Sequence, residues 1–165
     1  MWETRVTGFA VVEHAGSLLM VRHERLGVTR WELPGGHVDG RESVEEATAR
    51  ETREETGLAV RVHHLVASCM HEWSERRQRR LILYFAAQPE DPLATPIPRQ
   101  AEGINEVAWL DPRTVAPAEV SPFLRPLLAQ WPLILRPDNR PPFMRARHVQ
   151  DADSRWHPEI LTEER

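Results

Sequence analysis

The chain has 165 residues, a length that fits one compact domain with a sizeable core, and its formal net charge is −4. Its single cysteine, Cys69, excludes an intrachain disulfide framework and a cysteine-rich zinc site, and the acidic balance argues against a general nucleic-acid binder. No stretch approaches the roughly 18 apolar residues of a membrane span, and the N-terminus lacks a signal-peptide pattern. We therefore expect a soluble cytoplasmic protein without membrane partners.

The first elements in chain order are predicted to form a hairpin. β-branched and apolar residues predict strands over 5–12 and 18–22, and the small polar residues 14–17 form the turn between them. Residues 23–30 are polar and predict a loop. The apolar piece 31–36 ends in a proline and two glycines, which break regular structure.

A helix is predicted to begin at Ser43 and to end at Gly57. Ser43 followed by Glu46 three residues later is a capping-box pattern, which places Ser43 at the N-cap. Glycine is the residue that most often follows the last turn of a helix.

The next elements are predicted to be strands and loops. Apolar runs predict strands over 60–67, 81–87 and 106–110, with the arginine-rich segment 75–80 between the first two. Residues 88–101 contain four prolines and predict a loop.

A C-terminal amphipathic helix is predicted from residue 122, because apolar residues recur at helical spacing. These are Phe123, Leu124, Leu127, Leu128 and Trp131. After residue 135 the composition shifts to Pro, Arg, Asp and His, so we expect a domain over 1–135 and an irregular extension over 136–165. Strands with one central and one terminal helix indicate an α+β domain with a mixed sheet.

The acidic residues are concentrated in the predicted central helix, where six of the 25 fall between Glu42 and Glu55. Glu51, Glu54 and Glu55 stand at i, i+3 and i+4, so a helix places them on one face. A hard cation such as Mg²⁺ or Mn²⁺ would relieve their repulsion. The alternative is a solvated face of alternating Glu and Arg. The glycines at 35–36, whose backbone amides can face an anion, favour the first interpretation and chemistry on phosphates.

Residues 36–58 resemble the signature of the Nudix hydrolases, G-x5-E-x7-R-E-U-x-E-E-x-G-U, in which U is a bulky aliphatic residue. The residues that match are Gly36, Glu42, Arg50, Glu51, Glu54, Glu55, Gly57 and Leu58. Thr52 departs from the signature at the first U, where its hydroxyl group adds a polar atom to the packing of the helix.

The resemblance implies the Nudix α/β/α sandwich over residues 1–135, with a mixed β-sheet, a central helix that carries the signature and a C-terminal amphipathic helix. It also implies a site for Mg²⁺ or Mn²⁺, formed by Gly36, Glu51, Glu54, Glu55 and Glu102. Arg50 resembles the arginine that holds a signature carboxylate in position, and Glu42 resembles a bracing acid. Glu106 competes with Glu102 for the role of the late-loop glutamate, although a polar strand edge explains Glu106 more simply.

The implied activity is the metal-dependent hydrolysis of a nucleoside diphosphate linked to another moiety, with water attacking phosphorus. Glu54, Glu55 and Glu102 are the candidate general bases, and Arg50 supports them. The alternative is a catalytically silent Nudix-like nucleotide-binding or regulatory module, which the intact signature disfavours. Nudix enzymes are frequently dimers, so a homodimer is one alternative for the assembly.

Substrate contacts outside the signature are predicted from arginine and tryptophan residues. All 21 basic residues are arginine, so a side-chain grip on phosphate must come from arginine or a metal. Arg76, Arg77, Arg79 and Arg80 are candidates, with a solvated turn as the alternative. Trp31 is a candidate for stacking on a nucleobase, with core packing as the alternative.

Overall fold

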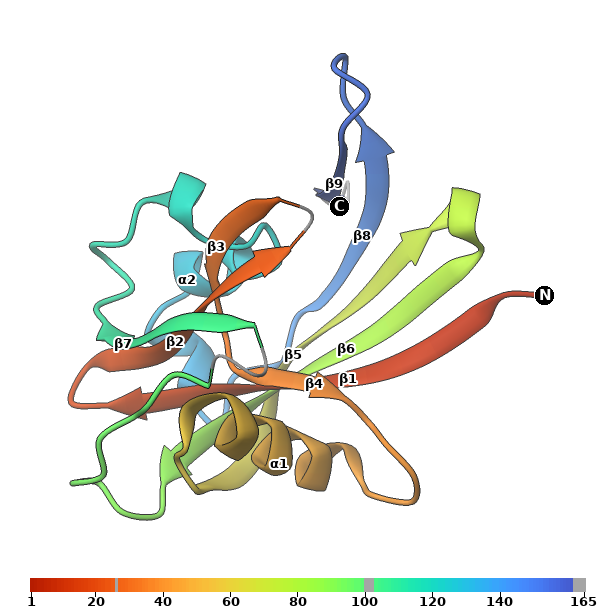
Figure 1. Cartoon of the computed structure of the whole chain (residues 1–165). Coiled ribbons are helices and arrows are strands. Elements are labelled where there is room, and N and C mark those ends of the chain that lie inside the picture. Colours follow the sequence, from red (N-terminus) through yellow and green to blue (C-terminus); the bar gives the residue numbers. More distant parts are fainter. Residues whose placement is uncertain (26, 100–102, 162–165) are drawn as a thin grey trace.

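A computed structural model describes residues 1–25, 27–99 and 103–161, which form a curled mixed sheet with helices on its two faces (Figure 1). The strands follow the order β3-β2-β1-β6-β5-β8-β9, with β4 on β1 and β7 on β2. They are β1 Glu3–His14, β2 Ser17–Arg25, β3 Val28–Glu32, β4 Gly35–His37, β5 Val60–Trp73, β6 Gln78–Pro89, β7 Ile104–Leu110, β8 Phe143–Gln150 and β9 Trp156–Leu161. The predicted α+β class with a mixed sheet is confirmed.

The predicted hairpin of β1 and β2 is confirmed, but the loop predicted over 23–30 is wrong. The chain stays extended to Arg25 and returns at once as β3, which pairs antiparallel with β2. Polar side chains are tolerated there because β3 lies at the edge of the sheet and much of its surface faces solvent. An ion pair of 3.2 Å between Arg25 Nε and Glu32 Oε2 links the two strands.

The alternating side chains of β1 pack into two hydrophobic cores, one on each face of the sheet. Ala10 and Val12 are fully buried and pack with Leu58 on one face. Val11 points to the opposite face and packs with Leu124 in the larger core. This period of two, apolar on both sides, is the pattern of a strand buried between layers.

Helix α1, Val44–Thr56, covers one face of the sheet and has the predicted ends. Ser43 and Glu46 form the complete capping box, and Gly57 closes the helix at φ 75° with its amide donating to the carbonyl group of Arg53. The helix lies very close to β1, because a Cβ atom at Gly8 would collide with the side chain of Thr48.

The opposite face is covered by the segment after β7, in which the predicted amphipathic helix is mostly absent. The structure contains the 3₁₀ turn η3 Pro117–Glu119, the five-residue helix α2 Arg125–Ala129 and the 3₁₀ turn η4 Leu133–Leu135. Pro126 fits only the start of a helix, and Pro132 disfavours helical geometry in the residue before it. The apolar side chains still enter the larger core, as the periodicity indicated.

The expectation of an irregular segment after residue 135 is also wrong, because β8 and β9 extend the sheet beyond β5. β8 pairs parallel with β5 and antiparallel with β9. In β8 the buried Met144 and Ala146 alternate with the exposed Arg145 and Arg147, which is the pattern of a half-buried strand. Within the described ranges, no helix combines the length and apolar character needed to cross a lipid bilayer.

Candidate functional site

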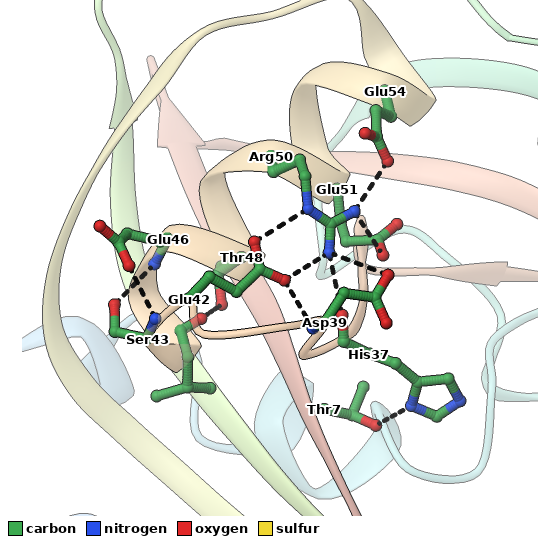
Figure 2. A network of polar contacts seen from close by, with 11 residues as sticks. Thr7, His37, Asp39, Glu42, Ser43, Glu46, Thr48, Arg50, Glu51 and Glu54 are labelled. Carbon is green, nitrogen blue, oxygen red and sulfur yellow. Dashed lines mark hydrogen bonds and ion pairs between the residues drawn. The ribbon is translucent and has the colours of Figure 1, made fainter.

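The side chain of Arg50 links the middle of α1 to the loop that precedes the helix (Figure 2). Its Nε and Nη2 atoms donate to both carboxylate oxygens of Glu42, at 3.0 and 2.7 Å. Nη2 also donates to the carbonyl oxygen of His37 at 3.0 Å. The hydrogen bonds from Arg50 hold the pKa of Glu42 down at about 2. Arg50 therefore fixes the loop against the helix through charge-assisted bonds.

The third nitrogen of the same guanidinium group joins two carboxylates of the helix. Nη1 of Arg50 donates to Glu51 Oε1 at 3.0 Å and to Glu54 Oε2 at 2.9 Å. The side chain of Glu51 is 16% exposed and that of Glu54 is 45% exposed, so the pair spans the rim of the protein surface. Two carboxylates thus converge on one positively charged atom.

The side chain of Glu55 points toward the sheet and not toward Arg50. Its Oε2 atom accepts a hydrogen bond of 2.9 Å from the backbone amide of Gly35, and the residue is 5% exposed. Burial, together with the negative charges of Glu51 and Glu32, raises the pKa of Glu55 to about 8, although the hydrogen bond from Gly35 opposes the shift. A nearby cation would favour the ionised form of this carboxyl group.

β4 brings the backbone of the two glycines against these carboxylates. Gly36 pairs with Gly8 of β1, and a Cβ atom at Gly36 would collide with the carboxyl group of Glu51. Glu51, Glu54 and Glu55 form what we call the acidic face of α1. Only glycine at position 36 lets the strand and this face approach so closely.

The donor set fits a hard divalent cation. In the described part of the chain, no three acidic, histidine or cysteine side chains already stand in a metal-binding arrangement, since Glu51 and Glu54 hold Arg50 and Glu55 is bonded to Gly35. The donors themselves are carboxylates, which Mg²⁺ and Mn²⁺ prefer. Two of them already share one centre of positive charge, and the third is a buried acid whose ionisation a cation would favour.

Thr52, which departs from the signature, is accommodated without an unpaired hydroxyl group. The residue is fully buried, and its Oγ1 atom donates to the carbonyl oxygen of Thr48 at 2.7 Å. The added polar atom is satisfied within the helix, and the packing of α1 is kept.

Of the two late-loop glutamates, Glu106 lies within the described residues. Glu102 lies outside the described residues. Glu106 is exposed on β7, and its carboxylate lies 3.4 Å from Nη1 of Arg22. That position fits the simpler interpretation of Glu106 as a polar residue on a strand edge.

The predicted substrate contacts outside the signature are not gathered beside the acidic face. Trp31 is 9% exposed and belongs to the larger core, which favours its packing alternative. Arg76 lies over the ring of Trp73 at 3.9 Å, and Arg77 is exposed in the turn between β5 and β6. The turn therefore resembles the solvated alternative.

Sequence reasoning missed Glu32, whose charge acts on Glu55 from β3. Burial raises the pKa of Glu32, while its ion pair with Arg25 opposes this shift. The available signal was its position three residues before Gly35, immediately ahead of the glycine turn.

Comparison with known proteins places this chain in a family. The family model described as NUDIX domain matches residues 2–131. Phosphatase NudJ from Escherichia coli K12 is 37% identical over 73 residues, which are 44% of this chain and 46% of that protein. The chain thus spans about half the length of the curated relatives that it matches.

Solved structures share the fold. The MutT Nudix hydrolase from Burkholderia pseudomallei has a TM-score of 0.67 and 24% identity, over 78% of this chain and 98% of that chain. The E. coli ORF135 protein has a TM-score of 0.59 and 27% identity, over 84% of this chain and 96% of that chain.

Proposed function

This chain belongs to the Nudix family, and we propose that it is a divalent-metal-dependent pyrophosphohydrolase. The proposed reaction is the attack of water on phosphorus in a nucleoside diphosphate linked to another moiety. The observation that carries the proposal is the convergence of Glu51 and Glu54 on one nitrogen of Arg50, beside the backbone of Gly36. The name of the relative, Phosphatase NudJ, agrees with chemistry on phosphates.

We assign the binding of Mg²⁺ or Mn²⁺ to Glu51, Glu54 and Glu55, with the backbone of Gly36 and with Glu102 as a further ligand. When bound, such an ion neutralises phosphate oxygens and lowers the pKa of water. The protein side chains supply position and proton transfer. One of Glu54, Glu55 and Glu102 accepts the proton of the attacking water.

Arg50 is assigned a positioning role in this reaction. Its two bonds to Glu42 do not involve the acidic face, so they can hold the loop against α1 while Glu51 and Glu54 bind a cation. We further expect small nucleotides as substrates, a cytoplasmic location, and a monomer or homodimer that sedimentation would distinguish. Trp31, Arg76 and Arg77 stay predicted substrate residues whose surroundings favour other roles.

Chromatographic detection of the two phosphorylated products, across a panel of nucleotides, tests the proposal. The panel contains nucleoside triphosphates, nucleotide sugars, ADP-ribose and dinucleotides, each assayed with Mg²⁺, with Mn²⁺ and with EDTA. We expect hydrolysis of at least one member that EDTA abolishes and Mg²⁺ or Mn²⁺ restores. Saturable binding without hydrolysis across the panel would instead identify a silent nucleotide-binding module.

A further inference from the structure

A second charged cavity lies on the sheet away from α1, and the proposed hydrolysis does not use it. Arg5 of β1 is the register partner of Arg80 of β6, and Arg80 is the partner of His71 of β5. Register partners lie side by side on one face of a sheet, so the three side chains form a row across neighbouring strands. All three line the cavity. Figure 1 shows β1, β6 and β5 running together at this end of the molecule.

Arg80 carries a positive charge that no described residue neutralises by direct contact. Arg5 is paired with Glu3 at 2.6 Å, and Arg25 is paired with Glu32 at 3.2 Å. The side chain of Arg80 has neither a hydrogen bond nor an ion pair within residues 1–25, 27–99 and 103–161, although the residue is half-buried. Burial and the charge of Arg25 lower the pKa of Arg80; the charge of Glu32 opposes this shift, but Glu32 is paired with Arg25 and forms no ion pair with Arg80 among the described residues. Buried charges in proteins are normally paired, so this guanidinium lacks an anion.

The other walls of the cavity supply hydrogen-bond donors. Trp73 lines it, and the indole Nε1 atom of Trp73 is buried without a partner among the described residues. His71 Nε2 and His148 Nδ1 are 2.8 Å apart, so the neighbouring strand β8 fixes the orientation of the His71 ring. The one carboxylate on the wall, that of Glu3, is already bound by Arg5 and Gln78. Such a site favours a group with several acceptor oxygens.

The cavity lies within electrostatic reach of the acidic face of α1. His37 follows Gly36 in β4, and its carbonyl oxygen is bound by Arg50. The ring Nδ1 atom of His37 lies 2.9 Å from Oγ1 of Thr7, and Thr7 follows Arg5 by two residues on β1, so both lie on the same face of the strand. A ligand bound at the acidic face can therefore also meet the field of Arg80.

We propose that this cavity binds a phosphate group, with the guanidinium of Arg80 as its principal partner. Phosphate binding in the cavity needs neither a divalent metal nor hydrolysis, so this part of the inference is independent of the proposed function. We further infer that the cavity is a subsite for a second phosphate of the substrate, distinct from the diphosphate under attack, and this part rests on the proposed function. Such a subsite would select substrates that carry a phosphate monoester in addition to the diphosphate.

Titration with inorganic phosphate in EDTA, at constant ionic strength, tests the site directly. Calorimetry gives the affinity, and the ¹H–¹⁵N signal of the Trp73 indole, assigned with W73F, reports the location. We expect saturable binding that shifts this signal. R80Q should weaken binding by about tenfold or more. The matched control is R61Q, which removes an exposed arginine of β5 and should bind within about twofold of the parent.

The stability of R80Q separates a binding role from a structural one. Because Arg80 is unpaired, its removal should leave the melting temperature equal or higher in the absence of phosphate. Phosphate should raise the melting temperature of the parent and of R61Q but not of R80Q. Absence of saturable binding to the parent, or equal affinity in R80Q and R61Q, would overturn the proposal.

A pair of substrates tests the subsite role. NAD⁺ and NADP⁺ share one diphosphate and differ by one phosphate monoester. In the parent, we expect the KM for NADP⁺ to be lower than the KM for NAD⁺. In R80Q the two KM values should be equal, and kcat should be unchanged. Equal KM values in the parent would overturn the subsite role. If neither compound is hydrolysed and the wider panel is also inert, the proposed function fails, while the phosphate titration still decides whether the cavity binds phosphate.

Discussion

The acidic face of α1 and the basic cavity on the sheet carry opposite excesses of charge. At α1, Glu51, Glu54 and the preceding Glu42 all bind the single guanidinium of Arg50, and the buried Glu55 adds a further carboxyl group. In the cavity, Arg80 has no paired carboxylate, whereas the charges of the nearby Arg5 and Arg25 are already paired with glutamates. A charge left over inside a protein attracts a ligand of the opposite sign. The two regions are therefore complementary, since one calls for a cation and the other for an anion.

The two regions also differ in how the chain builds them. The residues of the acidic face lie between positions 36 and 55, so a capped helix and one short loop are sufficient to position them. The row of Arg5, Arg80 and His71 in the basic cavity takes one residue from each of β1, β6 and β5, and depends on their pairing. Changes to α1 should thus act locally on turnover, whereas changes in the cavity should act on binding.

The largest effect is expected from E54Q, which keeps the shape of the side chain and removes one charge from the acidic face. We expect kcat to fall by roughly 10³-fold, because a ligand and candidate base is lost. The melting temperature should change little, since the side chain is 45% exposed. E45Q, on the exposed first turn of the same helix, is the control. Near-normal turnover of folded E54Q in saturating Mg²⁺ would contradict the assignment.

R50A should affect both turnover and stability. The variant leaves Glu42, Glu51 and Glu54 without their shared cation, and the loop loses its link to α1. We expect kcat to fall by about 10²-fold and the free energy of unfolding to fall by about 2 kcal/mol. Urea denaturation measures the second quantity. R53A, an exposed arginine of the same helix, should change it by less than about 0.5 kcal/mol; equal losses in the two variants would refute the bracing role.

The wall of the basic cavity should make stability depend on pH. Burial lowers the pKa of His71 to about 3 and that of His148 to about 4, from 6.5. Below pH 6.5 the unfolded chain binds protons that the folded chain does not, so stability is lost as the pH falls from about 7 to 4. H71F should reduce the slope of the unfolding free energy in this range, by at most about 1.4 kcal/mol per pH unit. H63N changes an exposed histidine and should keep the slope; an unchanged slope in H71F would contradict the prediction.

The smallest effect is expected from S43A, which removes the N-cap of α1 without touching its acidic face. Loss of the bond from Glu46 N to Ser43 Oγ should lower the free energy of unfolding by about 1 kcal/mol. Turnover should stay within about twofold under conditions where the protein is folded. A much larger loss of turnover would mean that the first turn of α1 takes part in the reaction.

Features encoded locally were predictable from the sequence. The capping box and the closing glycine define α1, because each acts within one turn of the chain. The spacing of Glu51 and Glu54 on this helix placed both carboxylates on the same side, where Arg50 meets them. The contact of Arg50 with the loop needs only residues up to 13 positions away.

Features that depend on distant pairing were not predictable in the same way. The row of Arg5, Arg80 and His71 arises from the register of three strands, which no local pattern specifies. Arg80 was predicted only as one of four arginines in the segment 75–80, because the register that separates it from the turn at 76–77 is not visible in the sequence. The helix predicted after residue 122 has the right apolar period, but its prolines permit only five helical residues. The alternation in β8 was present in the sequence, yet it covers only a few residues amid prolines and arginines.

The pairing of β8 with β5 has a consequence for shortened versions of the chain. The family match ends at residue 131, before this strand begins. A protein cut there would leave the Ser68–Glu72 stretch of β5 with an open row of backbone donors and acceptors, ready to join another sheet. At this edge of the sheet, as far as residue 161, the outermost described strand is β9, where Pro158 lacks an amide hydrogen and Glu159 adds charge. The C-terminal hairpin thus replaces an edge prone to aggregation with one that resists it.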